Sequence, residues 1–173
     1  MKEWLPKIID RICAVVGALL FMQFPLFAQQ YSQRLSGHLE ELRYQVGLMN
    51  GIAVQSGKTL QEFILKFAHN SDIDVGRQGE LMEMMVTRLG NLNQALYSLN
   101  HSTVFTKPFT FIYYSDWEIF KSTMASYKLG IPISIEGLVY GMIGIFVGYF
   151  TFSALSALFT RVKRFVQVQP QRK

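Results

Sequence analysis

The chain has 173 residues, of which 50% are hydrophobic and 17% are charged, and its formal net charge is +5. This length allows one domain, or a small domain with membrane segments, and the composition is typical of a membrane protein with a polar insert. The single cysteine, Cys13, excludes an internal disulfide. The basic excess flanks the two apolar segments while the middle of the chain is balanced in charge, which argues against a nucleic-acid partner.

The first apolar segment follows a short basic start, and we interpret residues 12–28 as a retained transmembrane helix. The run is short for a span and is interrupted by Gln23 and Pro25, so a signal peptide cleaved after Ala28 is the alternative. Leu26 lies where cleavage prefers a small residue, and it therefore favours retention. Pro25 is expected to kink this helix or to end its membrane-embedded part.

Residues 29–132 are expected to form a helical domain outside the cytoplasm. The prediction rests on two heptad seams, Leu35, Leu39, Leu42, Val46, Met49, Ala53 and Met82, Met85, Leu89, Leu92, Leu96, Leu99. Each helix needs a cover for its apolar stripe, so we expect an antiparallel, coiled-coil-like pair. Gly37, Gly47 and Gly51 lie off the first seam, where they are expected to bend or interrupt that helix. A short amphipathic segment, 59–67, and a polar loop, 69–76, are expected to connect the two helices.

The stretch 104–114 is rich in aromatic and β-branched residues and contains Pro108. Because it has no evident partner strand, we expect an extended connector packed on helices. Its aromatic side chains suit a domain core or an interfacial belt beside a membrane, and the core is the favoured interpretation. Ser115 and Glu118 have the spacing of a capping box and predict a helix that ends at Gly130.

The segment Gly137–Phe159 carries no formal charge and is long enough to cross a hydrocarbon core of about 30 Å. It predicts a second transmembrane helix over residues 133–159, with Pro132 at its start. Since lipid tails are as apolar as Leu, helices in membranes associate through close packing of small residues. A packing face for the first helix, a second copy or another protein is therefore expected at Gly137, Gly141, Gly144 and Gly148, with Gly17 on the first helix.

The basic residues predict that both ends of the chain face the cytoplasm and that the middle is exported. Residues 1–11 are the cytoplasmic start, and residues 160–173 form a basic cytoplasmic tail. Arg161, Lys163 and Arg164 in this tail are expected to hold the chain to anionic lipid headgroups, at about 1 kcal/mol per residue.

The sequence offers little catalytic chemistry. It contains no HExxH, CxxC, GxSxG or phosphate-binding glycine motif, and its three histidines share no metal-ligand spacing. We therefore predict no enzymatic activity, no cofactor and no metal site. Glu136 lies near the start of the second span and Gln23 at a comparable depth on the first, so the two are a candidate intramembrane polar pair.

A resemblance covers nearly the whole chain. The segments DRICAVVGALLFMQFPLFAQQYSQRLSGHLEE and DWEIFKSTMASYKLGIPISIEGLVYG, with two apolar helices around a helical insert, resemble an uncharacterised bacterial membrane-protein family, one of the domains of unknown function. The resemblance implies a location in the bacterial inner membrane, and hence a periplasmic helical domain. It supplies no activity.

These observations favour a non-enzymatic accessory or scaffold subunit that binds membrane or periplasmic proteins, or further copies of itself. The helical domain and the glycine face are its expected contact surfaces. One alternative is a sensor input module that signals through a membrane partner. The other is an oligomeric channel or transporter component with Glu136 in its pathway.

Overall fold

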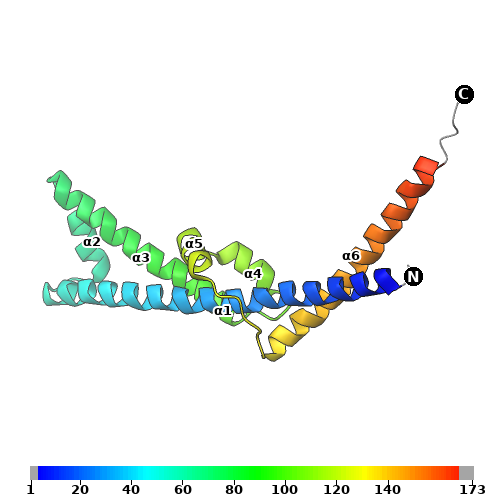
Figure 1. Cartoon of the computed structure of the whole chain (residues 1–173). Helices are drawn as coiled ribbons and strands as arrows, with labels where there is room; N and C mark the ends of the chain where they lie inside the picture. Colours follow the sequence, from blue (N-terminus) through cyan, green and yellow to red (C-terminus); the bar gives the residue numbers. More distant parts are fainter. Residues whose placement is uncertain (1–3, 168–173) are drawn as a thin grey trace, which may run out of the picture. The chain divides into compact units, whose positions relative to one another are not determined.

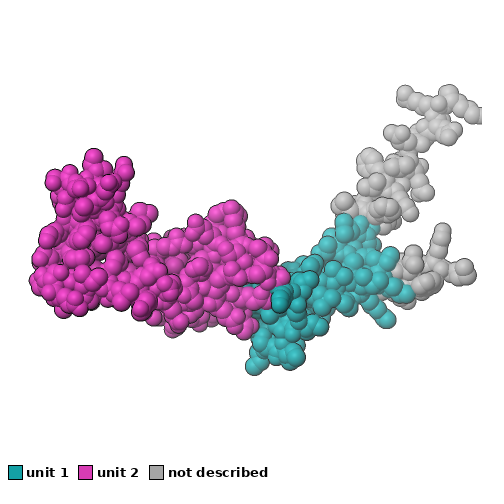
Figure 2. Space-filling model, turned by 60° about the vertical axis from the view of Figure 1, so that its left-hand side comes forward, with its two compact units in different colours: residues 1–28, 128–173 teal, residues 29–127 magenta. Residues whose placement is uncertain are grey.

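The computed structural model describes the backbone of residues 4–167 and the side chains of residues 8–157. Within residues 4–167 it consists of six helices and no strand, which confirms the predicted all-α class (Figure 1). Two helices are long and apolar enough to cross a membrane, over Ile8–Gln55 and Ile135–Ala157. The chain divides into two compact units, residues 1–28 with 128–173 and residues 29–127 (Figure 2).

Helix α1, Trp4–Gln55, is one uninterrupted helix of 52 residues that contributes to both units. Pro25 lies inside it, where the missing N–H removes one backbone hydrogen bond without ending the helix. The predicted interruption at Gly37, Gly47 and Gly51 is wrong. A Cβ built at any of these glycines meets nothing within 4 Å, so they lie on the open side of α1. Packing of the opposite side offsets their weak helix propensity, about 1 kcal/mol each relative to Ala.

The predicted seam residues form much of the core of the unit of residues 29–127. Buried or half-buried positions on α1 are Leu35, Leu39, Leu42, Val46, Met49 and Ala53. Those on α3, Ile73–Asn100, are Met82, Met85, Leu89, Leu92, Leu96 and Leu99. Arg43 links the two helices, because its Nη2 donates to Asn93 Oδ1 over 3.4 Å. Burial of both stripes is what their spacing predicted, whereas the coiled-coil arrangement stays a prediction.

Helix α2, Leu60–Ala68, is the short amphipathic segment between α1 and α3, and it buries Phe63 and Ile64. It begins at a capping box. The Thr59 hydroxyl accepts the Glu62 N–H over 3.2 Å, and the Glu62 carboxylate accepts the Thr59 N–H over 2.8 Å.

Helix α2 packs closely on the first turns of α3. A Cβ built on Gly79 would lie 2.6 Å from Ala68 Cα, so only glycine fits at this contact. Asp72 caps α3, its Oδ1 accepting the Asp74 N–H over 2.9 Å. The predicted polar loop 69–76 is therefore shorter than expected, because α3 already begins at Ile73.

Residues 107–114 correct the prediction of an extended connector. They form helix α4, Lys107–Tyr114, with Pro108 in its first turn, where the missing N–H has no helical partner to lose. Phe111 is buried, and its ring meets that of Tyr31 edge-on with 4.9 Å between centroids. A helix satisfies its own backbone groups, which a lone strand in this position would not do.

Helix α5, Trp117–Ser126, has its N-cap one residue later than predicted. Asp116 rather than Ser115 is the N-cap, and its Oδ1 accepts the N–H groups of Glu118 and Ile119 over 3.0 and 3.1 Å. Tyr31 supports this cap, because its hydroxyl accepts the Asp116 N–H over 2.7 Å. The helix ends before extended backbone at residue 127, so the predicted end at 130 is wrong.

Helix α6, Ile135–Gln167, contains the second apolar segment. It begins after Ser134, whose hydroxyl accepts the Gly137 N–H over 3.0 Å. The hydroxyl satisfies one of the first N–H groups of the helix. Pro132 therefore lies before the helix rather than at its first position.

Candidate functional site

Helices α1 and α6 meet backbone to backbone at three of the predicted packing glycines. A Cβ built on Gly17 would overlap the Gly144 carbonyl oxygen, and one built on Gly144 would lie 2.8 Å from Ala18 Cα. One turn further along α6, a Cβ on Gly148 would lie 3.0 Å from Ala14 Cα. Any larger residue would separate the helices, since backbone atoms have no rotamer with which to move aside. The glycine face therefore contacts the chain's own first helix.

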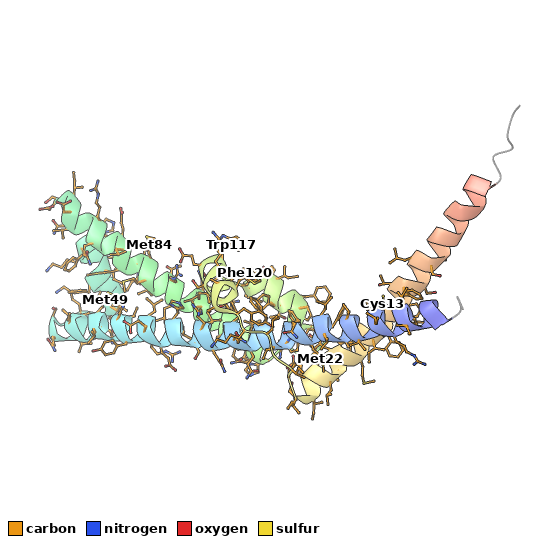
Figure 3. The ribbon with its side chains drawn as sticks, viewed as in Figure 1. Cys13, Met22, Met49, Met84, Trp117 and Phe120 are labelled. Atoms are coloured by element: carbon orange, nitrogen blue, oxygen red, sulfur yellow. The ribbon has the colours of Figure 1, made fainter. Side chains whose placement is uncertain are left out.

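The other two predicted packing glycines have different neighbours. A Cβ on Gly141 would lie 3.0 Å from Cε at the flexible end of Met22, a residue labelled on α1 in Figure 3. Gly137 faces Pro132, whose Cβ and Cγ would lie 2.8 Å from an added Cβ. The contact between the two backbones is thus centred on Gly144 and Gly148.

Gln23 joins α1 to the segment that leads into α6. Its Nε2 donates to the Gly130 carbonyl over 3.1 Å, and the Gly130 N–H lies 3.5 Å from its Oε1. The same Nε2 lies 3.0 Å from the Leu19 carbonyl oxygen. Glu136 is half-buried in the first turn of α6, and its pairing with Gln23 stays a prediction.

The predicted lipid-anchoring residues Arg161, Lys163 and Arg164 lie outside the residues whose side chains the structure describes. Among the described residues, no three or more His, Cys, Asp or Glu side chains gather in a way that would hold a metal ion. Two histidines close helix ends instead. His69 Nδ1 lies 3.1 Å from the Leu65 carbonyl, and His101 Nδ1 lies 2.8 Å from the Tyr97 carbonyl.

The unit of residues 29–127 carries an open groove of about 770 Å³ between α3 and the start of α5. Leu81, Met84 and Met85 supply its apolar wall, and the Met84 side chain is 67% exposed. Figure 3 shows Met84 on α3, with Trp117 and Phe120 on α5. Methionine is flexible and polarisable, so such a wall adapts to apolar surfaces of different shape.

A second hollow of about 310 Å³ extends the groove toward α4. The two hollows share Asn91, Leu92 and Asp116. Together they follow α3 from residue 80 to residue 95, a length of roughly 22 Å at about 1.5 Å per residue. We call this surface the α3 groove.

The charges along the α3 groove are mainly acidic. Glu80 and Glu83 line it, and Arg88 pairs with the N-cap carboxylate of α5 and with a carboxylate in its first turn. Arg88 Nη2 lies 3.5 Å from Asp116 Oδ2 and 3.0 Å from Glu118 Oε2. Since the arginine is about half-exposed, these pairs contribute at most about 1 kcal/mol to stability.

Sequence reasoning placed α3 but missed its groove. The seam predicts core positions for residues 82 and 85 and predicts no role for the neighbouring Leu81 and Met84. The run Leu81-Met82-Glu83-Met84-Met85 does hold a signal, because its apolar residues cover a wider arc of the helix than one seam needs. Which part of that arc stays uncovered depends on where α5 lies, and this requires the fold.

No curated protein and no solved structure matches the chain. The sequence model of one family, described as "Protein of unknown function (DUF2937)", matches residues 5–164 and so covers both compact units. The chain therefore belongs to this family of unknown function.

Proposed function

We propose that this protein is a non-enzymatic accessory or scaffold subunit of the bacterial inner membrane, and that the α3 groove binds a helical segment of another membrane or periplasmic protein. The observation that carries the proposal is the exposed apolar wall of Leu81 and Met84 in a groove long enough for a helix. An amphipathic helix recognises such a groove through apolar side chains at positions i, i+3, i+4 and i+7. Basic residues beside that stripe would meet Glu80 and Glu83.

The glycine face has a different part in this proposal. It holds α1 and α6 together, because Gly144 and Gly148 already contact α1. The two spans then act as a hairpin anchor that presents the unit of residues 29–127 outside the cytoplasm, with both chain ends inside. The basic residues at the two ends support this topology.

Cysteine accessibility tests the topology. In a Cys13→Ser chain, Asn70→Cys places one thiol on the exposed connection between α2 and α3. A membrane-impermeant maleimide added to intact spheroplasts should label this thiol fully. The parent Cys13→Ser chain, which has no thiol, should not be labelled. Labelling that requires lysis of the membrane would place the unit in the cytosol and contradict the proposal.

Site-specific photo-crosslinking tests the partner. A benzophenone side chain at position 84 of the full chain in native membranes should give one discrete adduct, whereas the same group at the exposed Asn50 of α1 should not. Leu81→Glu should abolish the adduct while leaving the far-UV circular dichroism unchanged, because it puts a charge on the apolar wall only. Adducts of equal yield at both positions, or a lone monomer by blue-native electrophoresis, would contradict the proposal.

A sensor input module is the second candidate. It is favoured by the groove volume of about 770 Å³, which lies within the range of about 300–1,000 Å³ common for small-molecule sites. In this case, a ligand rather than a helix would occupy the α3 groove, and the signal would pass to a membrane partner. Thermal-shift screening of the full chain should then find a compound whose stabilisation is lost in the Leu81→Glu variant.

A further inference from the structure

Helix α4 carries an apolar face that its own unit leaves open. Phe109, Ile112 and Tyr113 are 74%, 77% and 81% exposed, and their spacing of i, i+3 and i+4 places them on one side of the helix. The opposite side is occupied, because Phe111 is buried against Tyr31 and α4 also packs on α3. Helix α4 is thus held firmly with three large apolar side chains directed outward.

The contact with Tyr31 fixes α4 at one end of its unit. Tyr31 lies three residues past the predicted span 12–28 on the same uninterrupted helix. At about 1.5 Å per residue, this is roughly 5 Å beyond the end of the span. The headgroup layer on each side of a hydrocarbon core is about 5–8 Å thick, so Tyr31 and the helix packed on it belong at that depth.

The composition of this region matches that depth. No carboxylate occurs between His101 and Asp116, while aromatic residues are frequent there. Tyr and Trp gather where a bilayer meets water, because one end of the side chain is apolar and the other polar. After this unit, the chain leads into α6 through Leu129, Ile131 and Ile133, which are all strongly exposed.

We propose that α4 lies on the bilayer surface and inserts Phe109, Ile112 and Tyr113 among the lipid headgroups and upper acyl chains. This inference rests on the proposed insertion of the two spans, and it concerns a face of α4 that shares only Tyr113 with the α3 groove. A second copy of the chain is the competing occupant. It is disfavoured because α4 packs on Tyr31, three residues past the span, and the segment between His101 and Asp116 carries no carboxylate.

Quenching by brominated lipid tests the inference on the full chain. Each nanodisc holds one copy, with Trp4 and Trp117 replaced by Phe and one new Trp introduced by Phe109→Trp or Tyr113→Trp. Lipid brominated high on the acyl chain should lower the fluorescence of either Trp by roughly twofold relative to unbrominated lipid, as an interfacial helix lies about 5–10 Å into the boundary. Far-UV circular dichroism checks that each variant is folded.

Two matched controls separate the outcomes. Tyr44→Trp replaces a similarly exposed aromatic residue thirteen positions beyond Tyr31 on α1, roughly 20 Å away at about 1.5 Å per residue, and should not be quenched. Phe146→Trp, exposed on α6, should be quenched strongly if the spans are inserted. Quenching at 146 with none at 109 and 113 would overturn the inference while leaving the membrane anchor intact. Crosslinking of position 109 to a second copy in vesicles, together with no quenching in single-copy nanodiscs, would overturn it in favour of a dimer.

Discussion

In the unit of residues 1–28 and 128–173, helices α1 and α6 meet through the backbones of Gly17 and Gly144. In the unit of residues 29–127, large side chains such as Tyr31 and Ile119 fill the contact and are almost wholly buried. The difference is the one expected if α1 and α6 cross a membrane, as proposed above, while the other unit folds in water. Water rewards the burial of large apolar side chains, whereas lipid does not, so helices in lipid gain most from close backbone approach. The difference is one of degree, because Gly79 makes a close backbone contact in the unit of residues 29–127 and the other unit buries Phe27 and Tyr140.

The largest expected effect comes from removing a large side chain from the core of the unit of residues 29–127. Tyr31→Ala should lower the free energy of unfolding by about 3–5 kcal/mol, because it deletes an aromatic ring that is fully buried. Tyr31→Phe keeps the ring and loses only the bond accepted from the Asp116 N–H, so it should cost about 1 kcal/mol. In a chain with Trp4→Phe, Trp117 fluorescence during denaturant titration in micelles reports on this unit. Equal losses for the two variants would show that the ring does not carry the packing.

The glycine contact should be next in size. Gly144→Ala places a Cβ against the backbone of Gly17 and Ala18, which cannot yield, and should destabilise the α1–α6 contact by about 1–3 kcal/mol. Gly141→Ala is the matched control on the same helix, since its Cβ would meet only the flexible end of Met22. Titration with dodecyl sulfate measures both, followed by the fluorescence of Phe146→Trp in a chain whose Trp4 and Trp117 are replaced by Phe. An equal loss of stability for Gly141→Ala and Gly144→Ala would contradict the claim that close backbone approach stabilises the α1–α6 contact.

The sequence was informative where one periodicity described a whole helix. The heptad seams marked buried and half-buried residues of α1 and α3, and two of the four glycines spaced along α6, Gly144 and Gly148, meet the α1 backbone in the structure. It failed at α4, because aromatic and β-branched residues suggest extended backbone when read alone. The helix instead follows from Pro108 in its first turn and from the contact between Phe111 and Tyr31, which are far apart in sequence.

The candidate site was harder to predict than the core. A seam predicts which residues are covered, but the α3 groove also contains residues beside the seam, such as Leu81 and Met84, together with the seam residue Met85. The cap at α5 shows the same limit on a smaller scale. Ser115 and Asp116 both suit an N-cap, and the choice depends on the Tyr31 hydroxyl, a partner 85 residues away.

Variants at the N-cap of α5 measure how much a polar contact contributes to the stability of the unit of residues 29–127, beside the apolar contact of Tyr31. Asp116→Ala should cost about 1 kcal/mol, within a usual range of about 0.5–2, because the Glu118 and Ile119 N–H groups lose their acceptor. Ser115→Ala should cost much less, since Asp116 rather than Ser115 is the N-cap. Thermal unfolding of the full chain in micelles measures both. A larger loss of stability for Ser115→Ala than for Asp116→Ala would show that Ser115 rather than Asp116 caps the helix.

The smallest expected effect is a pH dependence at the capping box of α2. Hydrogen bonds from the Thr59 N–H and hydroxyl hold the pKa of the exposed Glu62 carboxyl below its ordinary value of 4.5. At neutral pH the carboxylate is ionised in both the folded and the unfolded chain, so its contribution to stability is fully present. As the pH falls below 4.5, the unfolded chain binds a proton first, and the contribution is lost as the pH passes the folded pKa. The difference in melting temperature between wild type and Glu62→Gln should therefore be small at pH 7 and vanish in acid. A difference that persists in acid would mean that the side chain stabilises α2 by something other than its charge.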